Sequence, residues 1–195
     1  GLFPEQSVNW NWMRELMKEN KNISVLNLFA YTGGATLACA QAGANVVHVD
    51  SSKSAVSWAR ENAELSGLTA KPIRWIIEDV RIFVSREIKR GNKYDGIIMD
   101  PPAFGHGVNN EIWKIEENFM NLVEDCFKLL SDKPLFFLIN GYSAGYSSLA
   151  YENVMKILIE KYDGILEIGE LAIEESEDEK TARLLPCGIF SRWSK

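Results

Sequence analysis

Short apolar runs alternate with longer amphipathic stretches along most of the chain, beginning at Ser24. The apolar runs have the length of strands and occupy residues 25–29, 45–49, 73–77, 96–99 and 135–139. The amphipathic stretches have helical spacing and occupy residues 34–41, 54–65, 81–89, 116–130 and 148–162. Apolar strands separated by helices are typical of a parallel sheet that is buried on both faces. The pattern therefore predicts an α/β fold with helices on both faces of the sheet.

The two ends of the chain depart from this alternation. Apolar residues recur at helical spacing from Asn9 to Met17, which predicts a helix that Asn9 caps and that packs as a lid or brace. Residues 165–173 and 182–193 are strand-like and flank the acidic run 174–179, so we expect an antiparallel hairpin with a solvated turn. Gly43 and Gly67 stand where helices are expected to end, because glycine accepts the left-handed conformation there. A terminal antiparallel strand argues against a dinucleotide-binding domain, which normally continues with a parallel sixth strand.

Composition narrows the class of protein. The chain has 195 residues, 46% of them hydrophobic, so we expect one sizeable core. The net charge of −6, with no basic run denser than residues 89–93, argues against a surface that grips nucleic acid mainly by neutralising phosphates. Three cysteines without CxxC spacing make a disulfide framework or a zinc site unexpected and favour a reducing cytoplasm. We expect no membrane attachment, and a first residue other than methionine predicts that Gly1 follows a removed segment or an upstream module.

The turn after the first predicted strand contains a pair of glycines, in Ala30-Tyr31-Thr32-Gly33-Gly34. Glycines let the backbone approach a ligand and open a helix whose free amides favour an anionic group such as a carboxylate. An ordinary strand-to-helix turn explains the pair about equally well. The turn does not match G-x-G-x-x-G, so the close approach that the pyrophosphate of NAD requires is poorly supported.

Acidic residues end the next two predicted strands. Asp50 stands where a carboxylate can accept two hydrogen bonds from ribose hydroxyls. Asp79 is placed to accept a hydrogen bond from an adenine amino group, to cap the helix that begins near Arg81, or to do both. Because ligands of such sheets bind at the carboxyl ends of the strands, we expect these acids at one site.

The fourth predicted strand runs into Asp100-Pro101-Pro102, with Phe104 close behind. Each proline restricts its own φ and the preceding residue, so this turn is rigid. It can offer a carboxylate and backbone carbonyls to the exocyclic amine of a flat ring, while Phe104 stacks on that ring. The alternative is a proline-rich turn that merely closes a strand.

We expect the two histidines of the chain to matter less to the site than its acidic residues. His48 lies in the middle of a predicted strand and is expected to be a satisfied core residue. His106, between two glycines, is expected in a mobile loop that closes over a substrate, where it either assists proton removal or has no chemical role. Two histidines are too few for most zinc sites, and no Ser-His-Asp pattern of a hydrolase is present.

Taken together, these residues resemble class I S-adenosylmethionine-dependent methyltransferases over essentially all the chain from Ser24. Residues 26–34, 100–104 and 1–6 are similar to the L-N-L-F-x-Y-T-G-G, D-P-P-x-F and G-x-F-x-[DE]-Q segments of the large-subunit ribosomal RNA methyltransferase I and K/L group. The resemblance implies a Rossmann-like fold with a terminal antiparallel hairpin strand, an amino-terminal segment and helix over residues 1–23, and a catalytic domain over residues 24–195. It implies S-adenosylmethionine as the cofactor, and with only two histidines in the chain we expect no metal. The residues that it implies for the cofactor site are Phe29, Ala30, Tyr31, Gly33, Asp50, Ser51, Asp79, Val80 and Asp100, and those for the catalytic, substrate-facing side are Asp100, Pro101, Pro102 and Phe104.

Two features depart from that group. Members that methylate a pyrimidine carbon carry a cysteine nucleophile just after the fifth strand, whereas residues 140–143 here contain none. Cys126 falls on an apolar helix face and Cys187 in the final hairpin, so a nitrogen acceptor is preferred. Residues 1–195 also do not include the amino-terminal RNA-binding module that the group usually carries. We predict methyl transfer to a nucleobase nitrogen of ribosomal RNA, with a non-catalytic S-adenosylmethionine-binding module, or a small-molecule or protein substrate, as alternatives.

Overall fold

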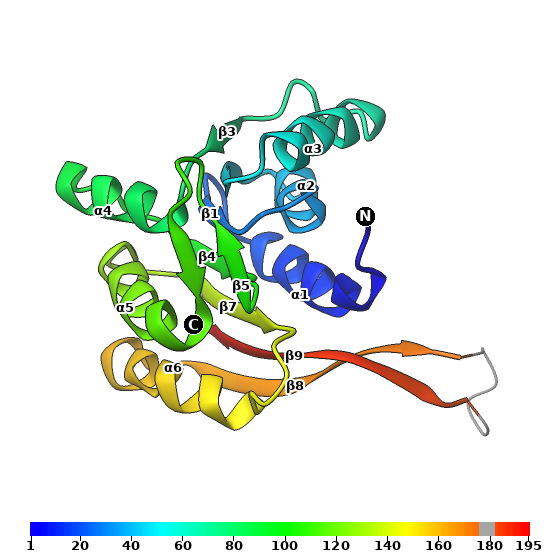
Figure 1. The fold of residues 1–195 in the computed structure, drawn as a ribbon, viewed down its shortest axis with the longest axis vertical. Coiled ribbons are helices and arrows are strands. Elements are labelled where there is room, and N and C mark those ends of the chain that lie inside the picture. The colour runs from blue at the N-terminus through cyan, green and yellow to red at the C-terminus, as the bar shows by residue number, and fades with distance from the viewer. Residues whose placement is uncertain (176–181) are drawn as a thin grey trace.

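A computed structural model describes residues 1–175 and 182–195, and its central feature is a seven-stranded sheet in the order β3-β2-β1-β4-β7-β9-β8 (Figure 1). The strands are β1 (Ser24–Leu28), β2 (Asn45–Asp50), β3 (Ile73–Ile77), β4 (Gly96–Met99), β7 (Phe136–Gly141), β8 (Ile165–Glu174) and β9 (Leu184–Ser194). The first five pair in parallel, and β9 pairs antiparallel with both β7 and β8. The α/β fold and the terminal antiparallel hairpin strand are confirmed. Most of the acidic turn predicted at 174–179 lies outside the described residues.

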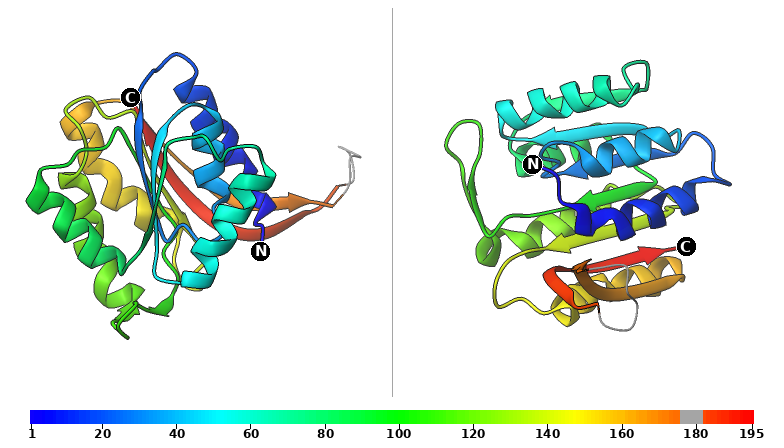
Figure 2. Two further views of the ribbon diagram at one scale, coloured as in Figure 1. Left: turned by 90° about the horizontal axis from the view of Figure 1, so that it is seen from above. Right: turned by 90° about the vertical axis from the view of Figure 1, so that its right-hand side faces the viewer.

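Helices cover both faces of this sheet, as predicted (Figure 2). One face carries α1 (Ser7–Met17), α2 (Gly34–Gln41) and α3 (Lys53–Leu65), which follow a short 3-10 helix η1 (Pro4–Gln6). The other face carries α4 (Val80–Arg90), α5 (Ile115–Lys128) and α6 (Ser148–Tyr162). The predicted helix ranges differ from these by two residues or fewer at each end, except at the start of α1. The division of the chain at residue 23 stays a prediction.

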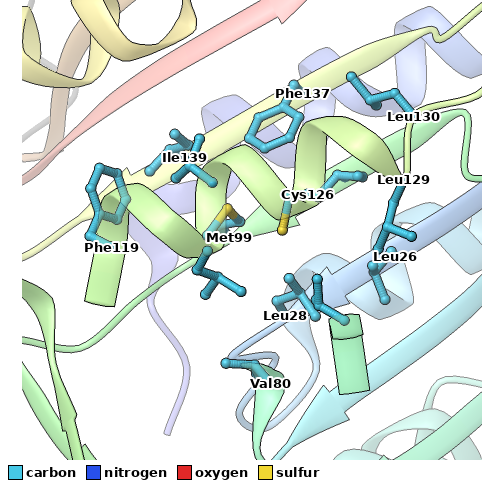
Figure 3. Packing of buried hydrophobic residues seen from close by; sticks show 14 of the residues in the cluster. Leu26, Leu28, Val80, Met99, Phe119, Cys126, Leu129, Leu130, Phe137 and Ile139 are labelled. Atoms are coloured by element: carbon cyan, nitrogen blue, oxygen red, sulfur yellow. The ribbon is translucent and has the colours of Figure 1, made fainter. Parts of the chain in front are cut away.

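Two apolar cores fill the space between the sheet and these helices. Under α4, α5 and α6, residues such as Leu28, Met99, Phe119 and Ile139 are buried together, with Cys126 among them as predicted (Figure 3). Under α1 and α2, Met13 packs with apolar residues of the opposite sheet face. Because β1, β4 and β7 are buried on both faces, their sequences are almost continuously apolar.

The helix ends show which local predictions held. Gly43 and Gly67 have φ of 94° and 68°, so both end a helix in the left-handed conformation, as predicted. The prediction that Asn9 caps the first helix is wrong, because η1 leads directly into α1 and Gln6 occupies the N-cap position without a side-chain cap. Asn9 instead lies inside the helix, fully buried, and its amide donates to Asn140 Oδ1 at 2.9 Å.

A second, two-stranded sheet lies where a mobile loop was predicted. The strands β5 (Phe104–His106) and β6 (Ile112–Lys114) pair antiparallel, so His106 is in a strand and not in an irregular loop. Ser51 Oγ donates to the His106 carbonyl oxygen at 2.9 Å, which ties this hairpin to the end of β2. The β8–β9 hairpin, by contrast, extends well beyond the rest of the fold (Figure 1).

Candidate functional site

A cavity of about 400 Å³ opens at the carboxyl ends of β1, β2 and β4. Every predicted site residue except Phe104 lines it, and these residues are Phe29, Ala30, Tyr31, Gly33, Asp50, Ser51, Asp79, Val80, Asp100, Pro101 and Pro102. The cavity lies at the switch point of the sheet, where β1 has β2 on one side and β4 on the other. The structure thus brings together acids and glycines that are far apart in the sequence.

The turn between β1 and α2 has an unusual backbone. Phe29 and Tyr31 have φ of 56° and 49°, which bulky residues rarely adopt, and Gly33 follows with a φ of 91°. A Cβ on Gly33 would also lie 3.1 Å from Ala59 Cβ. Such conformations cost of order 1 to 3 kcal/mol each and persist where surrounding contacts enforce them, often at functional sites. The turn leaves the first amides of α2 at the wall of the cavity.

Asp50 makes one of the contacts that hold the turn after β1 in this conformation. Its Oδ2 accepts a hydrogen bond from the Tyr31 amide at 2.8 Å, and its Oδ1 accepts one from the Ser52 amide at 2.8 Å. Burial raises the pKa of the Asp50 carboxyl, while these two amides act in the opposite direction. Each carboxylate oxygen has a second lone pair, so Asp50 can still accept hydrogen bonds from a ligand.

Asp79 holds a helix start and an arginine at once. Its Oδ1 accepts hydrogen bonds from the Arg81 amide at 2.8 Å and from Arg81 Nε at 3.1 Å, and its Oδ2 lies 2.8 Å from Arg81 Nη2. Burial alone would raise the pKa of Asp79, but the bonds and charge of Arg81 outweigh it and lower that pKa. The predicted role as the N-cap of α4 is confirmed.

Asp100 lies at the end of β4, opposite the glycine turn. Its Oδ2 accepts a hydrogen bond from Gln6 Nε2 at 2.7 Å. The pKa of Asp100 is raised to about 6, chiefly because of burial; the Gln6 hydrogen bond opposes this rise, and the negative charge of Glu5 adds to it. A carboxyl that is poised near neutrality inside a cleft is a candidate functional group.

One of the acceptors expected in the diproline turn is already engaged. The carbonyl oxygen of Pro102 accepts a hydrogen bond from Trp113 Nε1 at 2.7 Å, so β6 fixes the turn from behind. Trp113 is 3% exposed and packs against Phe29 with a ring-centroid distance of 4.9 Å. The turn is therefore held by tertiary contacts as well as by its prolines.

Phe104 does not line the cavity. Its side chain is 55% exposed on β5, and its ring packs edge-on against His106 at a centroid distance of 5.2 Å. His106 does line the cavity. An exposed aromatic ring beside the opening remains available to a substrate but not to a ligand deep inside.

His48 is fully buried, and only one of its ring nitrogens has a partner among the described residues. His48 Nδ1 lies 2.9 Å from Thr36 Oγ1, while Nε2 has none. The expectation of a core residue is thus confirmed, but that of full satisfaction is wrong. Burial, helped by the positive charge of Arg60, lowers the pKa of His48 to about 3.

The sequence analysis missed several wall residues of the cavity, among them Trp10, Trp113, Asn140 and Tyr142. Gln6 carried a signal, because it closes the 1–6 motif, but nothing in the sequence indicated that it reaches Asp100, 94 residues away. Trp10 read as part of an amphipathic helix face, although it lines the cavity and its indole nitrogen is buried without a partner in the described part of the chain.

Residues 1–175 and 182–195 lack two further kinds of feature. No helix there is long and apolar enough to cross a membrane. No group of three or more histidine, cysteine or acidic side chains is arranged there to hold a metal ion.

Comparisons with known proteins fit this geometry. The ribosomal RNA large subunit methyltransferase K/L of Hahella chejuensis is 34% identical over 133 residues, which cover 67% of this chain and 18% of that protein. The ribosomal RNA large subunit methyltransferase I of Aeromonas salmonicida is 43% identical over 81 residues, 41% of this chain and 20% of that protein. The chain thus spans about a fifth of the length of these two relatives.

A solved structure extends the similarity to the whole fold. The S-adenosylmethionine-dependent methyltransferase of Agrobacterium tumefaciens is 42% identical and matches 100% of this chain and 63% of its own, with a TM-score of 0.92. The model of the S-adenosylmethionine-dependent methyltransferase family matches residues 1–133, which include the glycine turn, Asp50, Asp79 and the diproline segment. The chain therefore belongs to the S-adenosylmethionine-dependent methyltransferases.

Proposed function

We propose that this chain moves a methyl group from S-adenosylmethionine to a nucleobase nitrogen in ribosomal RNA. The observation that carries the proposal is the single cavity that joins the strained glycine turn and Asp50 to the carboxylate of Asp100. The names of the ribosomal RNA methyltransferases among the relatives support an RNA acceptor.

The residues around the cavity fit the proposed cofactor. Asp50 has lone pairs free for ribose hydroxyls, and the amides at the start of α2 suit the carboxylate of an amino acid. Asp79 and Val80 line the wall where an adenine would bind. The volume of about 400 Å³ is within the range of small-molecule sites. The alternative of NAD as the cofactor is overturned by membership of the methyltransferase family.

When bound, S-adenosylmethionine supplies an electrophilic methyl group on a sulfonium. The chain has to align an acceptor lone pair with that methyl group and exclude water, which needs positioning more than a strong acid or base. Asp100 accepts a hydrogen bond from the acceptor amine and so directs its nitrogen into the cavity. Pro101 and Pro102 hold the carboxylate in place, and Phe104 stacks on the acceptor ring outside.

The cysteines support a nitrogen acceptor over a pyrimidine carbon. Cys39 and Cys126 are fully buried in the two cores, and Cys187 lies on β9. None of the three lines the cavity in the described part of the chain. Methylation of a pyrimidine carbon needs a nucleophile that adds to the ring, and no cysteine is in place to do so.

A transfer assay tests the proposal. Tritiated S-adenosylmethionine is incubated with the chain and bulk ribosomal RNA that lacks the modification, and the labelled nucleoside is identified. We expect label on a base nitrogen and a loss of at least about 100-fold in Asp100→Ala, because Asp100 acts where charge and geometry change in the transition state. Asp132→Ala, at an exposed aspartate after α5, is the matched control and should keep full activity.

Three results would contradict the proposal. Label on a base carbon would exclude the nitrogen acceptor. Label in a protein or small-molecule fraction, with none in RNA, would show that the methyl acceptor is not RNA. Normal transfer by Asp100→Ala would remove the role given to that carboxylate.

A further inference from the structure

Asp100 belongs to a hydrogen-bonded chain of four side chains. Gln6 Nε2 lies 2.7 Å from Asp100 Oδ2 and 2.9 Å from Tyr142 Oη. Tyr142 Oη in turn donates to Glu5 Oε1 at 3.0 Å. The chain thus links two acids, one from η1 and one from the end of β4, through an amide and a phenol.

The directions of these bonds follow from the groups present. Tyr142 has one hydroxyl proton, and it gives that proton to the Glu5 carboxylate, so its oxygen accepts the hydrogen bond from Gln6. The Gln6 group that faces Tyr142 must therefore be the NH₂ group, which has a second proton for Asp100. Glu5 and Tyr142 together fix which way the Gln6 amide points.

Packing around η1 also restricts the side-chain amide of Gln6. Glu5 and Gln6 are 7% and 5% exposed, in a 3-10 helix whose first residue is Pro4. The ring of Phe3 packs on Tyr142 and on Tyr31, with centroid distances of 5.6 Å and 5.9 Å. These contacts seat η1 against the mouth of the cavity, so Gln6 has little freedom to leave Asp100.

Only Oδ2 of Asp100 is used in this way, and no described residue donates a hydrogen bond to Oδ1. We infer that Gln6 is a positioning residue, which engages one oxygen of Asp100 so that the other is presented to the acceptor amine. This inference rests on the proposed function of Asp100, and it gives the amino-terminal segment a part in orienting the acceptor.

Charge around Asp100 agrees with this role. Glu5 faces the site from η1, Tyr142 from the end of β7 and Tyr151 from α6. Burial raises the pKa of Asp100, the negative charge of Glu5 adds to that rise, and Gln6 opposes both by bonding to the ionised form. Without Gln6, Asp100 would take up a proton at a higher pH, and one of its two oxygens would then be a hydroxyl that donates a hydrogen bond.

The test is to follow the Asp100 carboxyl directly in Gln6→Leu. Carbon-13 NMR of the aspartate-labelled chain records its titration, and Asp100→Asn assigns the signal. We expect the midpoint in Gln6→Leu to move up by roughly half to one pH unit, as the loss of one hydrogen bond to an ionised group requires. Gln41→Leu makes the same change at the exposed end of α2 and should leave the midpoint unmoved.

The pH dependence of methyl transfer provides a second measurement. The acid limb of the pH profile for methyl transfer to RNA should move upward by the same amount in Gln6→Leu, while the Kd for S-adenosylmethionine changes less than about threefold.

If the RNA is not methylated by the unaltered chain but the NMR midpoint still shifts, the proposed function fails and the positioning contact stands. If the midpoint in Gln6→Leu equals that in Gln41→Leu, the inference is overturned. Should Gln6→Leu fail to fold, Tyr142→Phe, compared with Tyr146→Phe, must show an upward shift in the same titration or the inference fails.

Discussion

His48 shows how one buried side chain can make stability depend on pH. The pKa of its imidazole is lowered from 6.5 to about 3 in the folded chain, chiefly because burial disfavours the charged ring. Its neighbours Thr36 and Asn27 offer a hydroxyl and an amide but no negative charge. The ring is therefore neutral when folded and free to take up a proton when unfolded.

We expect the free energy of unfolding to fall on acidification because of this residue. Its contribution is complete above about pH 6.5, where both states are neutral, and declines by about 1.4 kcal/mol per pH unit between there and pH 3. Urea unfolding of the chain at pH 7 and pH 5 measures the effect. His48→Gln should show a clearly smaller difference between the two pH values. His106→Gln, at the other histidine, should behave as the unaltered chain, and an equal response of both variants would contradict the assignment.

The indole of Trp113 helps to hold the β5–β6 hairpin in place. Trp113 Nε1 donates to the Pro102 carbonyl, and the hairpin meets β2 through Ser51 and His106. Trp113→Phe keeps an aromatic ring but removes the donor, and we expect it to destabilise the chain by about 1 to 3 kcal/mol in urea unfolding. Amide hydrogen exchange across residues 102–114 should accelerate.

Trp58→Phe is the matched control for this change. Trp58 is 55% exposed on α3, so the same substitution there should leave both unfolding and hydrogen exchange within experimental scatter. Slow exchange at residues 102–114 in Trp113→Phe would show that the hairpin is held in some other way.

The two sheets also show what the sequence could predict and what it could not. The central parallel strands β1, β4 and β7 could be predicted because burial on both faces requires nearly unbroken apolar runs, as in Gly96–Met99. The outer strands β2 and β3 are partly exposed, but they keep enough apolar residues to be recognised. The strands β5 and β6 were missed because each has three residues, mostly exposed, so no period-2 pattern could develop. Asp50 and Asp79 were found from their place after strands, since that place follows from the local order of elements. The contact between Gln6 and Asp100 could not be found, because it depends on how η1 docks on the finished sheet.

For the molecule as a whole, charge limits how RNA can be bound. The net charge is −6, and the densest basic run, residues 89–93, is partly occupied within the fold. Arg90 pairs with Glu87 at 2.9 Å, and Lys93 Nζ donates to the Lys128 carbonyl at 2.6 Å. Few cations are left there to neutralise phosphates.

We therefore expect the affinity of this chain for RNA to depend only weakly on salt. A plot of log affinity against log salt concentration should have a slope shallower than about −2, because the slope scales with the number of phosphates neutralised. Lys89→Gln should leave the affinity within about twofold. Filter binding between low and physiological salt measures both, and a steep slope would reveal a cationic surface that the composition does not indicate.

The position of β9 between β7 and β8 has a consequence for how the chain reaches its native state. Until β9 docks, β7 is a bare sheet edge whose apolar residues and unpaired amides invite association with other molecules. β8 cannot close that edge alone, because its pairing in the sheet is with β9. The edge of the parallel half therefore stays open until β9 pairs with β7, and a substitution that slows this pairing should raise aggregation during refolding without changing the cavity.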